Sequence, residues 1–279
     1  MPMADLDALA RRWRDQLAAW AIPDSITAAA EESPWALPHG AFERRTRSLV
    51  EDPSGVSFER AREALAPAGE VLDVGAGTGA AGLPLAPWAR AITAVDEDAT
   101  MLAVLAGLAR ELDTPVRTIE GRWPDVAGHT GPADVVVCHH VLFNVADLVP
   151  FVRALTDHSR RRVVVELPAR HPMAPLNPLW SRFHGLDRPT GPIAADAAAL
   201  LRELGLEPHV QEWRRPAQTL YASEYELVET TRRRLCLPPA RHGEVAAALR
   251  DLGDDGPFTR AATRELVTVW WTGTAARGQ

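Results

Sequence analysis

The sequence predicts an α/β protein: a doubly wound, mostly parallel sheet of seven strands, with an antiparallel last strand and an N-terminal helical segment. From residue 70 onward, short apolar runs alternate with helix-compatible runs, which favours right-handed crossovers and a parallel sheet. The first apolar run ends in three glycines at alternate positions, Gly75, Gly77 and Gly79. Glycines in this arrangement predict a tight turn that brings bare main chain close to a ligand.

Residues 1–66 are expected to be helical. Apolar residues recur there at steps of three and four, which predicts one buried helix face formed by Leu6, Leu9, Trp13, Leu17 and Trp20. A second helix is expected from Phe58 to Leu65. This segment either packs onto the core or covers the active site as a lid, and the two roles are compatible. Residues 67–279 are expected to form the main domain.

The seven strands are expected at residues 70–75, 91–95, 115–119, 133–138, 162–167, 207–213 and 264–272. The run at 133–138 is almost continuously apolar, as is typical of a buried parallel strand. Helices are expected at about 79–89, 99–111, 148–155 and 194–204. The last two strands have no clean crossover helix between them, which predicts an antiparallel pair at the sheet edge, interrupted by a helical insertion at 222–251.

Composition excludes several classes of protein. The chain has 279 residues and a formal charge of −7, so it has no overall basic footprint for nucleic acid. It contains no run of 18 apolar residues and no basic–apolar leader, and two cysteines make no disulfide framework. We therefore expect a soluble cytoplasmic protein. All 30 basic residues are arginine, which excludes Schiff-base and P-loop lysines and is typical of a GC-rich bacterial genome.

The glycine turn allows two interpretations. As Gly75, Gly77 and Ala80 it matches a dinucleotide site, but the carboxylate of Asp73 would repel a pyrophosphate at close range. As Asp73-x-Gly75-x-Gly77-x-Gly79 it resembles the first motif of the class I S-adenosylmethionine-dependent methyltransferases, a Rossmann-like family. The cationic methionine ammonium of that cofactor would instead attract Asp73.

The resemblance covers about residues 68–170. It implies that S-adenosylmethionine is the cofactor, with S-adenosylhomocysteine as the product. It places the cofactor loop at Asp73, Gly75, Ala76 and Gly77. It also implies that Asp96 with Glu97, after the second strand, receives the ribose hydroxyls, and that Met101 covers one face of the adenine.

One position departs from the family pattern. An acid that accepts from the adenine amino group is common after the third strand, but here the chain has Gly121-Arg122-Trp123-Pro124-Asp125. We therefore expect Arg122 and Trp123 at the cofactor, with Trp123 stacking on the base or Asp125 replacing the acid. Ordinary packing of Trp123 is the alternative.

Chemistry is expected at the end of the fourth strand, where the chain reads Cys138-His139-His140-Val141-Leu142-Phe143-Asn144. A neutral imidazole titrates near physiological pH and can remove a proton from a hydroxyl or ammonium. We expect His139 and His140 to be catalytic, one as the general base and the other, with His139 favoured, at the cofactor. The alternative is that both only hydrogen-bond the loop. Adjacent histidines on an extended chain point apart, so no metal site is expected.

The acceptor is expected to lie near Asn144 and the proline-rich stretch after the fifth strand. That stretch, to Pro192, is expected to be a rigid loop whose Arg170, His171, Trp180 and His184 recognise a polar or anionic acceptor. The alternative is a stiff surface connection.

The sequence therefore predicts a methyltransferase that acts on an O or N atom of a small molecule, without nucleic-acid or membrane partners. Three alternatives stay open: methylation of RNA or protein, a non-catalytic S-adenosylmethionine-binding module, and an NAD-linked oxidoreductase. The acceptor and the oligomeric state are not determined by the sequence.

Overall fold

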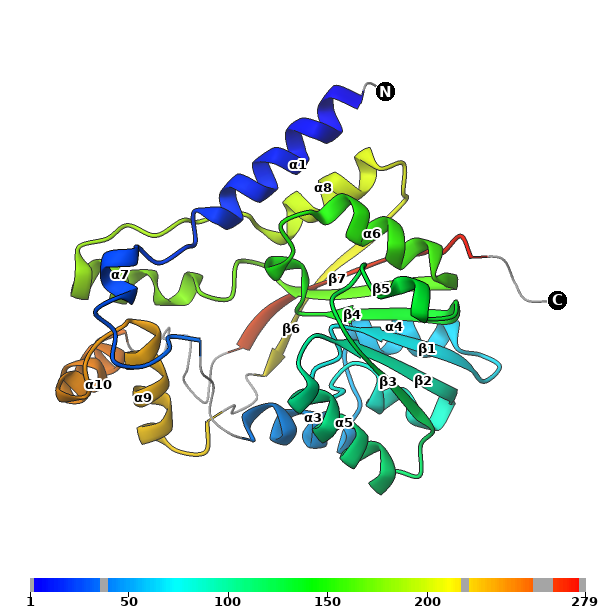
Figure 1. Cartoon of the computed structure of the whole chain (residues 1–279), viewed down its shortest axis with the longest axis horizontal. Coiled ribbons are helices and arrows are strands. Elements are labelled where there is room, and N and C mark those ends of the chain that lie inside the picture. The colour runs from blue at the N-terminus through cyan, green and yellow to red at the C-terminus, as the bar shows by residue number, and fades with distance from the viewer. Residues whose placement is uncertain (1–2, 36–39, 217–220, 253–262, 276–279) are drawn as a thin grey trace.

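The computed structural model describes residues 3–35, 40–216, 221–252 and 263–275. Seven strands form one sheet in the order β3-β2-β1-β4-β5-β7-β6 (Figure 1). β7 runs antiparallel to both of its neighbours, β5 and β6, and the other six strands share one direction. The predicted fold class is therefore confirmed. The strands are β1 Gly69–Val74, β2 Ala89–Asp96, β3 Val116–Glu120, β4 Ala133–His139, β5 Ser159–Pro168, β6 His209–Pro216 and β7 Thr263–Thr272.

Helices cover both faces of the sheet (Figure 1). One apolar core joins the sheet to α1 (Met3–Ala18), α6 (Leu148–Asp157) and α8 (Ala194–Glu203). The core on the opposite face joins it to α4 (Val56–Ala64) and α5 (Ala99–Glu111). The central strands β4 and β5 are buried by both layers, which is why each contains an uninterrupted apolar run, Val135–Cys138 and Val163–Val165.

The described part of the N-terminal segment contributes four helices. α1 packs against α8, and the side chain of Trp13 is only 1% exposed while its indole donates to the carbonyl of Val145 at 2.8 Å. Two further helices are α2 (Asp24–Thr27) and α3 (Ala41–Glu51). Thr46 of α3 is buried, with its hydroxyl 2.7 Å from that of Thr78. α3 is thereby linked to the turn after β1. α1 packs onto the core, and a role of the N-terminal segment as a lid over the active site remains a prediction.

Two expected elements are wrong in detail. Where a helix was expected at 79–89, the chain forms turns and then a 3₁₀ helix, η1 (Leu83–Trp88). Pro84 and Pro87 lack amide hydrogens, so a regular α-helix would lose bonds there. Where a rigid loop was expected after β5, the chain forms η4 (Ala174–Leu176) and α7 (Asn177–His184).

A helical lobe lies to one side of the sheet (Figure 1). Its own apolar cluster joins α7 to α9 (Glu224–Arg234) and α10 (His242–Asp251), the two helices that follow β6. Short 3₁₀ helices occur at η2 (Ala127–His129), η3 (Leu142–Asn144) and η5 (Pro239–Arg241). In the ranges that the structure describes, every helix is too short or too polar to cross a bilayer.

Candidate active site

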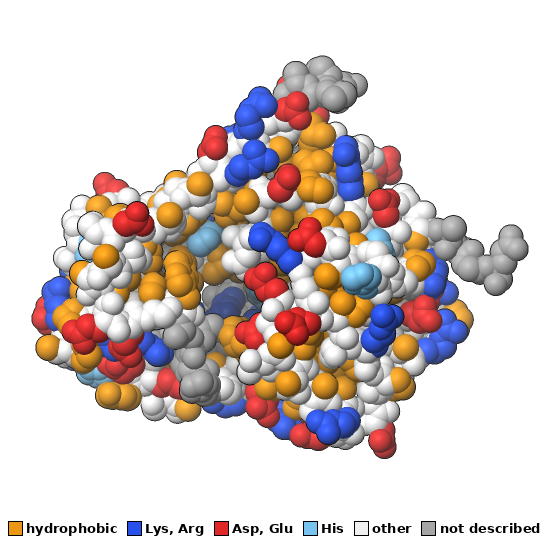
Figure 2. Space-filling model, in the orientation of Figure 1, with side chains coloured by type: hydrophobic (Ala, Val, Ile, Leu, Met, Phe, Trp, Pro, Cys, Tyr) orange, Lys and Arg blue, Asp and Glu red, His pale blue; other side chains and the backbone are white. Residues whose placement is uncertain are grey.

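A cavity of about 730 Å³ opens at the ends of β1, β2, β4 and β5. Figure 2 shows a hollow in the centre of this face, with basic side chains at its floor and acidic ones along its rim. Its wall joins the turn after β1 to the end of β4 and to residues of α3 and β6. This is the edge of an open α/β sheet where ligands generally bind.

The turn after β1 gives the cavity a wall of bare main chain. Gly75, Gly77 and Gly79 have φ angles of 69°, 51° and 92°, which favour glycine. A methyl group on Gly75 would lie 2.3 Å from Val141, whereas one on Gly77 would meet no atom within 4 Å. The open space at Gly77 fits a ligand lying against the turn. Gly75, Ala76 and Gly77 all line the cavity, as expected.

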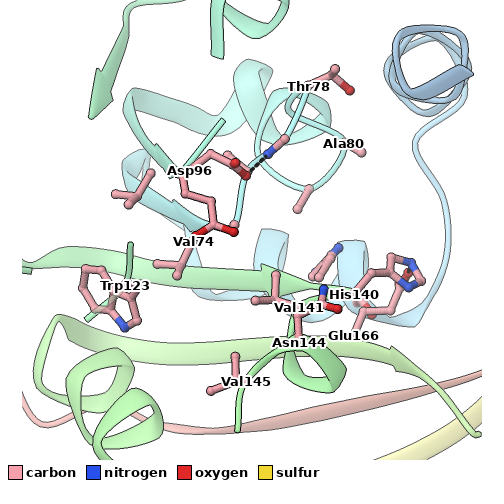
Figure 3. A pocket seen from close by; sticks show the side chains of 18 of the residues that line it. Val74, Thr78, Ala80, Asp96, Trp123, His140, Val141, Asn144, Val145 and Glu166 are labelled. Atoms are coloured by element: carbon pink, nitrogen blue, oxygen red, sulfur yellow. Dashed lines mark hydrogen bonds and ion pairs between the residues drawn. The ribbon is translucent and has the colours of Figure 1, made fainter. Parts of the chain in front are cut away.

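Asp96 connects the end of β2 to this turn (Figure 3). One of its carboxylate oxygens accepts from the amide of Gly77 at 2.7 Å, and the other accepts from the amide of Asp98 at 2.9 Å. Each oxygen keeps a lone pair beyond these bonds. Asp96 and Glu97 both line the cavity, where a pair of hydroxyls could bind to the remaining lone pairs.

Asp73 lies behind the wall instead of in it. It is 1% exposed, it does not line the cavity, and its Oδ2 accepts from the amide of Gly82 at 2.8 Å. Burial raises the pKa of Asp73 to about 7, Gly82 opposes the shift, and the charge of Asp96 adds to it. Direct attraction of a ligand ammonium by Asp73 is therefore not what this geometry shows, because the carboxyl group holds the turn from behind.

Of the remaining predicted cofactor residues, some line the cavity and one does not. Met101 lies in the first turn of α5, where its amide is capped by Asp98, and it does not line the cavity. Arg122 and Trp123 do line it, together with Asp125. The Trp123 indole donates to the carbonyl of Phe151 at 3.4 Å, so the ring is held by the core while one part of it faces the cavity.

The end of β4 brings the two predicted histidines into the wall. His140 has a φ of 61°, an uncommon value for a residue with a side chain, and its amide donates to the carbonyl of Glu166 at 2.7 Å. Burial lowers the pKa of His139 to about 4, so this imidazole is neutral near pH 7. Burial and then Arg45 also lower the pKa of His140, while Glu166 opposes them.

His140 lies between an acid and a guanidinium group (Figure 3 shows it beside Glu166). Its Nε2 is 3.0 Å from Oε1 of Glu166 and 2.6 Å from a terminal nitrogen of Arg45. Since one ring nitrogen cannot donate and accept at once, the neutral ring satisfies one neighbour in each tautomer. Burial raises the pKa of Glu166, but His140, His139 and Arg215 outweigh it and hold that pKa well below its usual range.

Most of the residues predicted to bind the methyl acceptor lie outside the cavity. Asn144 of η3 lines the cavity, but Arg170, His171, Trp180 and His184 do not. His171 stacks on Trp20 with ring centroids 3.9 Å apart, and Trp180 is buried in the helical lobe. His184 contacts the carbonyl of Leu235 at 2.7 Å, and the exposed Arg170 pairs with Ile193 through its backbone. These four positions are corrected to structural roles: Trp180 and His184 lie on α7, which packs in the lobe, whereas Arg170 and His171 precede that helix.

Four charged residues of the cavity were missed, and one of them is Asp147, which directly precedes α6. Arg45 comes from α3, Glu166 from β5 and Arg215 from β6. Glu166 has a sequence signal, an acid inside the apolar run Val163–Leu167. Arg45 and Arg215 carry no local signal. Among the residues that the structure describes, no cluster of His, Cys, Asp or Glu could hold a metal ion.

Known proteins match this architecture. Residues 71–161 match the family model described as a methyltransferase domain. Among solved structures, the YcgJ protein of Bacillus subtilis is 15% identical, with 84% of this chain and 100% of that chain covered and a TM-score of 0.50. A candidate methyltransferase of Bacillus halodurans C-125 is 14% identical, with 77% and 96% covered and a TM-score of 0.50.

A candidate sarcosine dimethylglycine methyltransferase of Galdieria sulphuraria is 12% identical, with 92% and 98% covered and a TM-score of 0.51. No curated protein matches the chain. At these identities the solved structures show the fold, and the family model identifies the domain. The chain therefore contains a methyltransferase domain on a Rossmann-like fold, and S-adenosylmethionine is its cofactor.

Proposed function

We propose that this enzyme methylates an oxygen or nitrogen atom of a small molecule, with His140 as the general base. The observation that carries the proposal is the presence of the glycine turn, Asp96 and the His140–Glu166 pair in one cavity. A cavity of about 730 Å³ is in the size range of small-molecule sites. Bound S-adenosylmethionine would supply an electrophilic methyl group on a sulfonium, whose loss leaves the neutral thioether of S-adenosylhomocysteine.

The turn and the end of β2 would hold the cofactor. Gly77 offers open main chain, and Asp96 offers two oxygens already oriented by the amides of Gly77 and Asp98. Arg122 and Trp123 lie at the same end of the wall, next to Asp125. We assign Asp96, Glu97 and Trp123 to the nucleoside, and we assign Asp73 to the support of the turn.

His140 would take the acceptor's proton as the new bond to carbon forms. Methyl transfer needs a lone pair on the acceptor, and a neutral imidazole can remove the proton that would otherwise remain on it. When Nε2 carries the hydrogen toward Glu166, Nδ1 keeps the lone pair that accepts this proton. Glu166 would then stabilise the imidazolium by charge, because its pKa lies well below its usual range.

The proposal is tested in two stages with the purified full chain. Calorimetry with S-adenosylhomocysteine should show binding, and NADH should show none. Labelled S-adenosylmethionine is then offered to pools of small hydroxylated and amine compounds, to RNA and to protein extracts. We expect label in the small-molecule pool, lowered about 100-fold by His140→Asn. Label confined to RNA or protein, or binding without transfer to any pool, would contradict the proposal.

A further inference from the structure

The floor of the cavity carries an excess of positive charge. Arg45 and Arg215 both line it, and Glu166 lies between them, 3.5 Å from a terminal nitrogen of Arg215. Among the described residues, the charges that act most on Arg45 are one carboxylate, Glu166, and the guanidinium groups of Arg264 and Arg215. Burial and these two cations lower the pKa of Arg45 to about 10, while Glu166 opposes them.

Arg215 is held in place rather than left mobile. Its guanidinium lies over the ring of Trp213, 4.8 Å from the centroid. The Trp213 indole donates to the hydroxyl of Thr268 at 2.9 Å, and that hydroxyl lies 2.7 Å from the one of Ser57. Gly55, with a φ of 103°, leaves the room that the Trp213 ring occupies, since a methyl group there would lie 2.4 Å from it. A fixed arginine at the floor is suited to a specific contact.

These cations and the acid do not satisfy one another. Among the described residues, Oε1 of Glu166 faces the ring of His140 at 3.0 Å and Oε2 faces a terminal nitrogen of Arg215 at 3.5 Å, while Nε of Arg215 is buried without a partner. Arg45 donates to the ring of His140, a weaker acceptor than a carboxylate. The floor therefore has guanidinium donors in excess of carboxylate acceptors, which is the arrangement expected where an oxyanion binds.

We propose that Arg45 and Arg215 form an anion subsite and that the methyl acceptor is a small molecule carrying a carboxylate. This inference rests on the proposed function, since it identifies the substrate class of the same cavity. A guanidinium group presents paired donors that match the two oxygens of a carboxylate. Counting Glu166 against Arg45 and Arg215, two of the three arginines that line the cavity, leaves one positive charge at its floor, which a monoanion neutralises.

Binding of the anion also sets the state of His140. When Arg45 turns to the carboxylate, Nε2 of His140 loses the donor that lies 2.6 Å away. The ring can then place its hydrogen on Nε2, facing Glu166 at 3.0 Å, and keep a lone pair on Nδ1. The acceptor that carries the anion would thus prepare the base that deprotonates it.

The test measures anion binding separately from methyl transfer. Wild-type protein saturated with S-adenosylhomocysteine is titrated with 4-hydroxybenzoate and acetate, with the neutral 4-hydroxybenzamide and acetamide, and with inorganic phosphate. We expect each carboxylate to bind about tenfold more tightly than its amide. Equal binding of acid and amide overturns the proposal, and so does binding of phosphate without binding of either carboxylate.

Variants assign the effect to the two arginines. Arg215→Gln and Arg45→Gln should each weaken carboxylate binding about tenfold while the affinity for S-adenosylhomocysteine stays within about twofold. Arg214→Gln is the matched control, because Arg214 is exposed, pairs with Glu265 and does not line the cavity. If Arg45→Gln does not fold, Arg45→Lys replaces it and should still bind carboxylate measurably. The result for Arg215→Gln then decides whether the anion subsite exists. Unchanged carboxylate binding in Arg215→Gln overturns the subsite.

Failure of the two proposals can be told apart. If the carboxylates bind through both arginines but no pool of small molecules accepts methyl, the subsite stands and the proposed function falls. If a small acceptor without an acidic group is methylated and carboxylates do not compete with it, the function stands and the subsite falls.

Discussion

Nε2 of His140 lies 3.0 Å from Oε1 of Glu166, in a wall where the nearest cation is only 2.6 Å from the same ring nitrogen. Opposite charges therefore act on one imidazole from two sides. Glu166 raises the pKa of His140, whereas burial and the guanidinium of Arg45 lower it, and the net pKa is lowered. Removing each neighbour in turn should move this titration in opposite directions.

We expect Glu166→Gln to lower the pKa of His140 further, because the neutral amide no longer stabilises the imidazolium. We expect Arg45→Gln to raise it, because a repelling cation is removed. Nitrogen-15 spectra of the histidine rings, recorded between pH 4 and pH 8, measure both changes. Glu265→Gln is the control, since Glu265 is an exposed acid paired with Arg214. Shifts of the same sign in the two test variants would refute this account of the pair.

Asp96 is the residue from which we expect the largest effect on cofactor affinity. Asp96→Asn keeps the size of the side chain, but the amide nitrogen that replaces one oxygen repels the hydrogen of Gly77 or Asp98. Hydrogen bonds to a charged group contribute about 1.5–3 kcal/mol, so affinity for S-adenosylhomocysteine should fall about 10- to 100-fold. Calorimetry measures this change.

A control variant at a nearby acid, Glu120, separates the loss of the Asp96 hydrogen bonds from a general loss of negative charge. Glu120 is exposed at the end of β3, pairs in register with Asp96 and does not line the cavity. Glu120→Gln should leave the affinity within about twofold of wild type. An equal loss in both variants would mean that the affinity reflects the general field of this edge and not the carboxylate of Asp96.

The turn after β1 makes a prediction about stability. A side chain at Gly75 must adopt a φ of 69° and place its methyl group 2.3 Å from Val141. Strain and overpacking together should lower the free energy of unfolding of Gly75→Ala by about 3 kcal/mol. Gly77→Ala has the strain without the collision, since nothing lies within 4 Å, and should lose only about 1 kcal/mol. Urea unfolding measures both.

Removing the side chain of Val141 tests whether the steric clash causes the loss of stability in Gly75→Ala. In the double variant Gly75→Ala with Val141→Ala, the colliding methyl groups of Val141 are gone. The summed cost of the two single variants should then exceed the cost of the double variant by about 1–2 kcal/mol. Additive losses would show that the backbone angle alone makes Gly75 necessary.

Local signals in the sequence were enough for the sheet and for the position of the glycine turn and Asp96, but not for Asp73 and Met101, which do not line the cavity. The apolar runs at 133–138 and 162–167 predicted buried strands because both faces of β4 and β5 are covered. Asp96 followed from its place at the end of the second strand, and it lines the cavity beside Gly77. The prolines after β5 predicted a rigid loop, but Pro178 lies in the first turn of α7, where its missing amide hydrogen costs nothing.

The floor of the cavity could not be predicted in the same way. Arg45 and Arg215 are 170 positions apart and meet only because α3 and the edge strand β6 both reach the end of β5. In the sequence Arg45 directly follows Arg44, and Arg215 directly follows Arg214. Neither Arg44 nor Arg214 lines the cavity. Tertiary packing therefore determines which of the two adjacent arginines faces the cavity. Glu166 differs, because an acid within an apolar strand is visible without a structure.

The pH dependence of stability should carry the signature of a buried neutral histidine. Burial lowers the pKa of His139 to about 4 in the folded protein, against about 6.5 in an unfolded chain. Between these values the unfolded chain binds the proton and the folded protein does not, so stability falls as the pH falls. From pH 8 to pH 5 the free energy of unfolding should drop by about 2 kcal/mol on account of this residue.

Wild type alone cannot show the effect, because Asp73 acts with the opposite sign. Burial raises its pKa to about 7 from an ordinary value near 3.8, so its contribution to stability falls as the pH rises from about 4 to 7. The measurement is therefore the difference between wild type and His139→Asn in urea unfolding at pH 5 and pH 8. Asp73 is common to both proteins and cancels. We expect the variant to lose about 2 kcal/mol less than wild type on acidification, and an equal loss would mean that His139 accepts a proton in the folded protein.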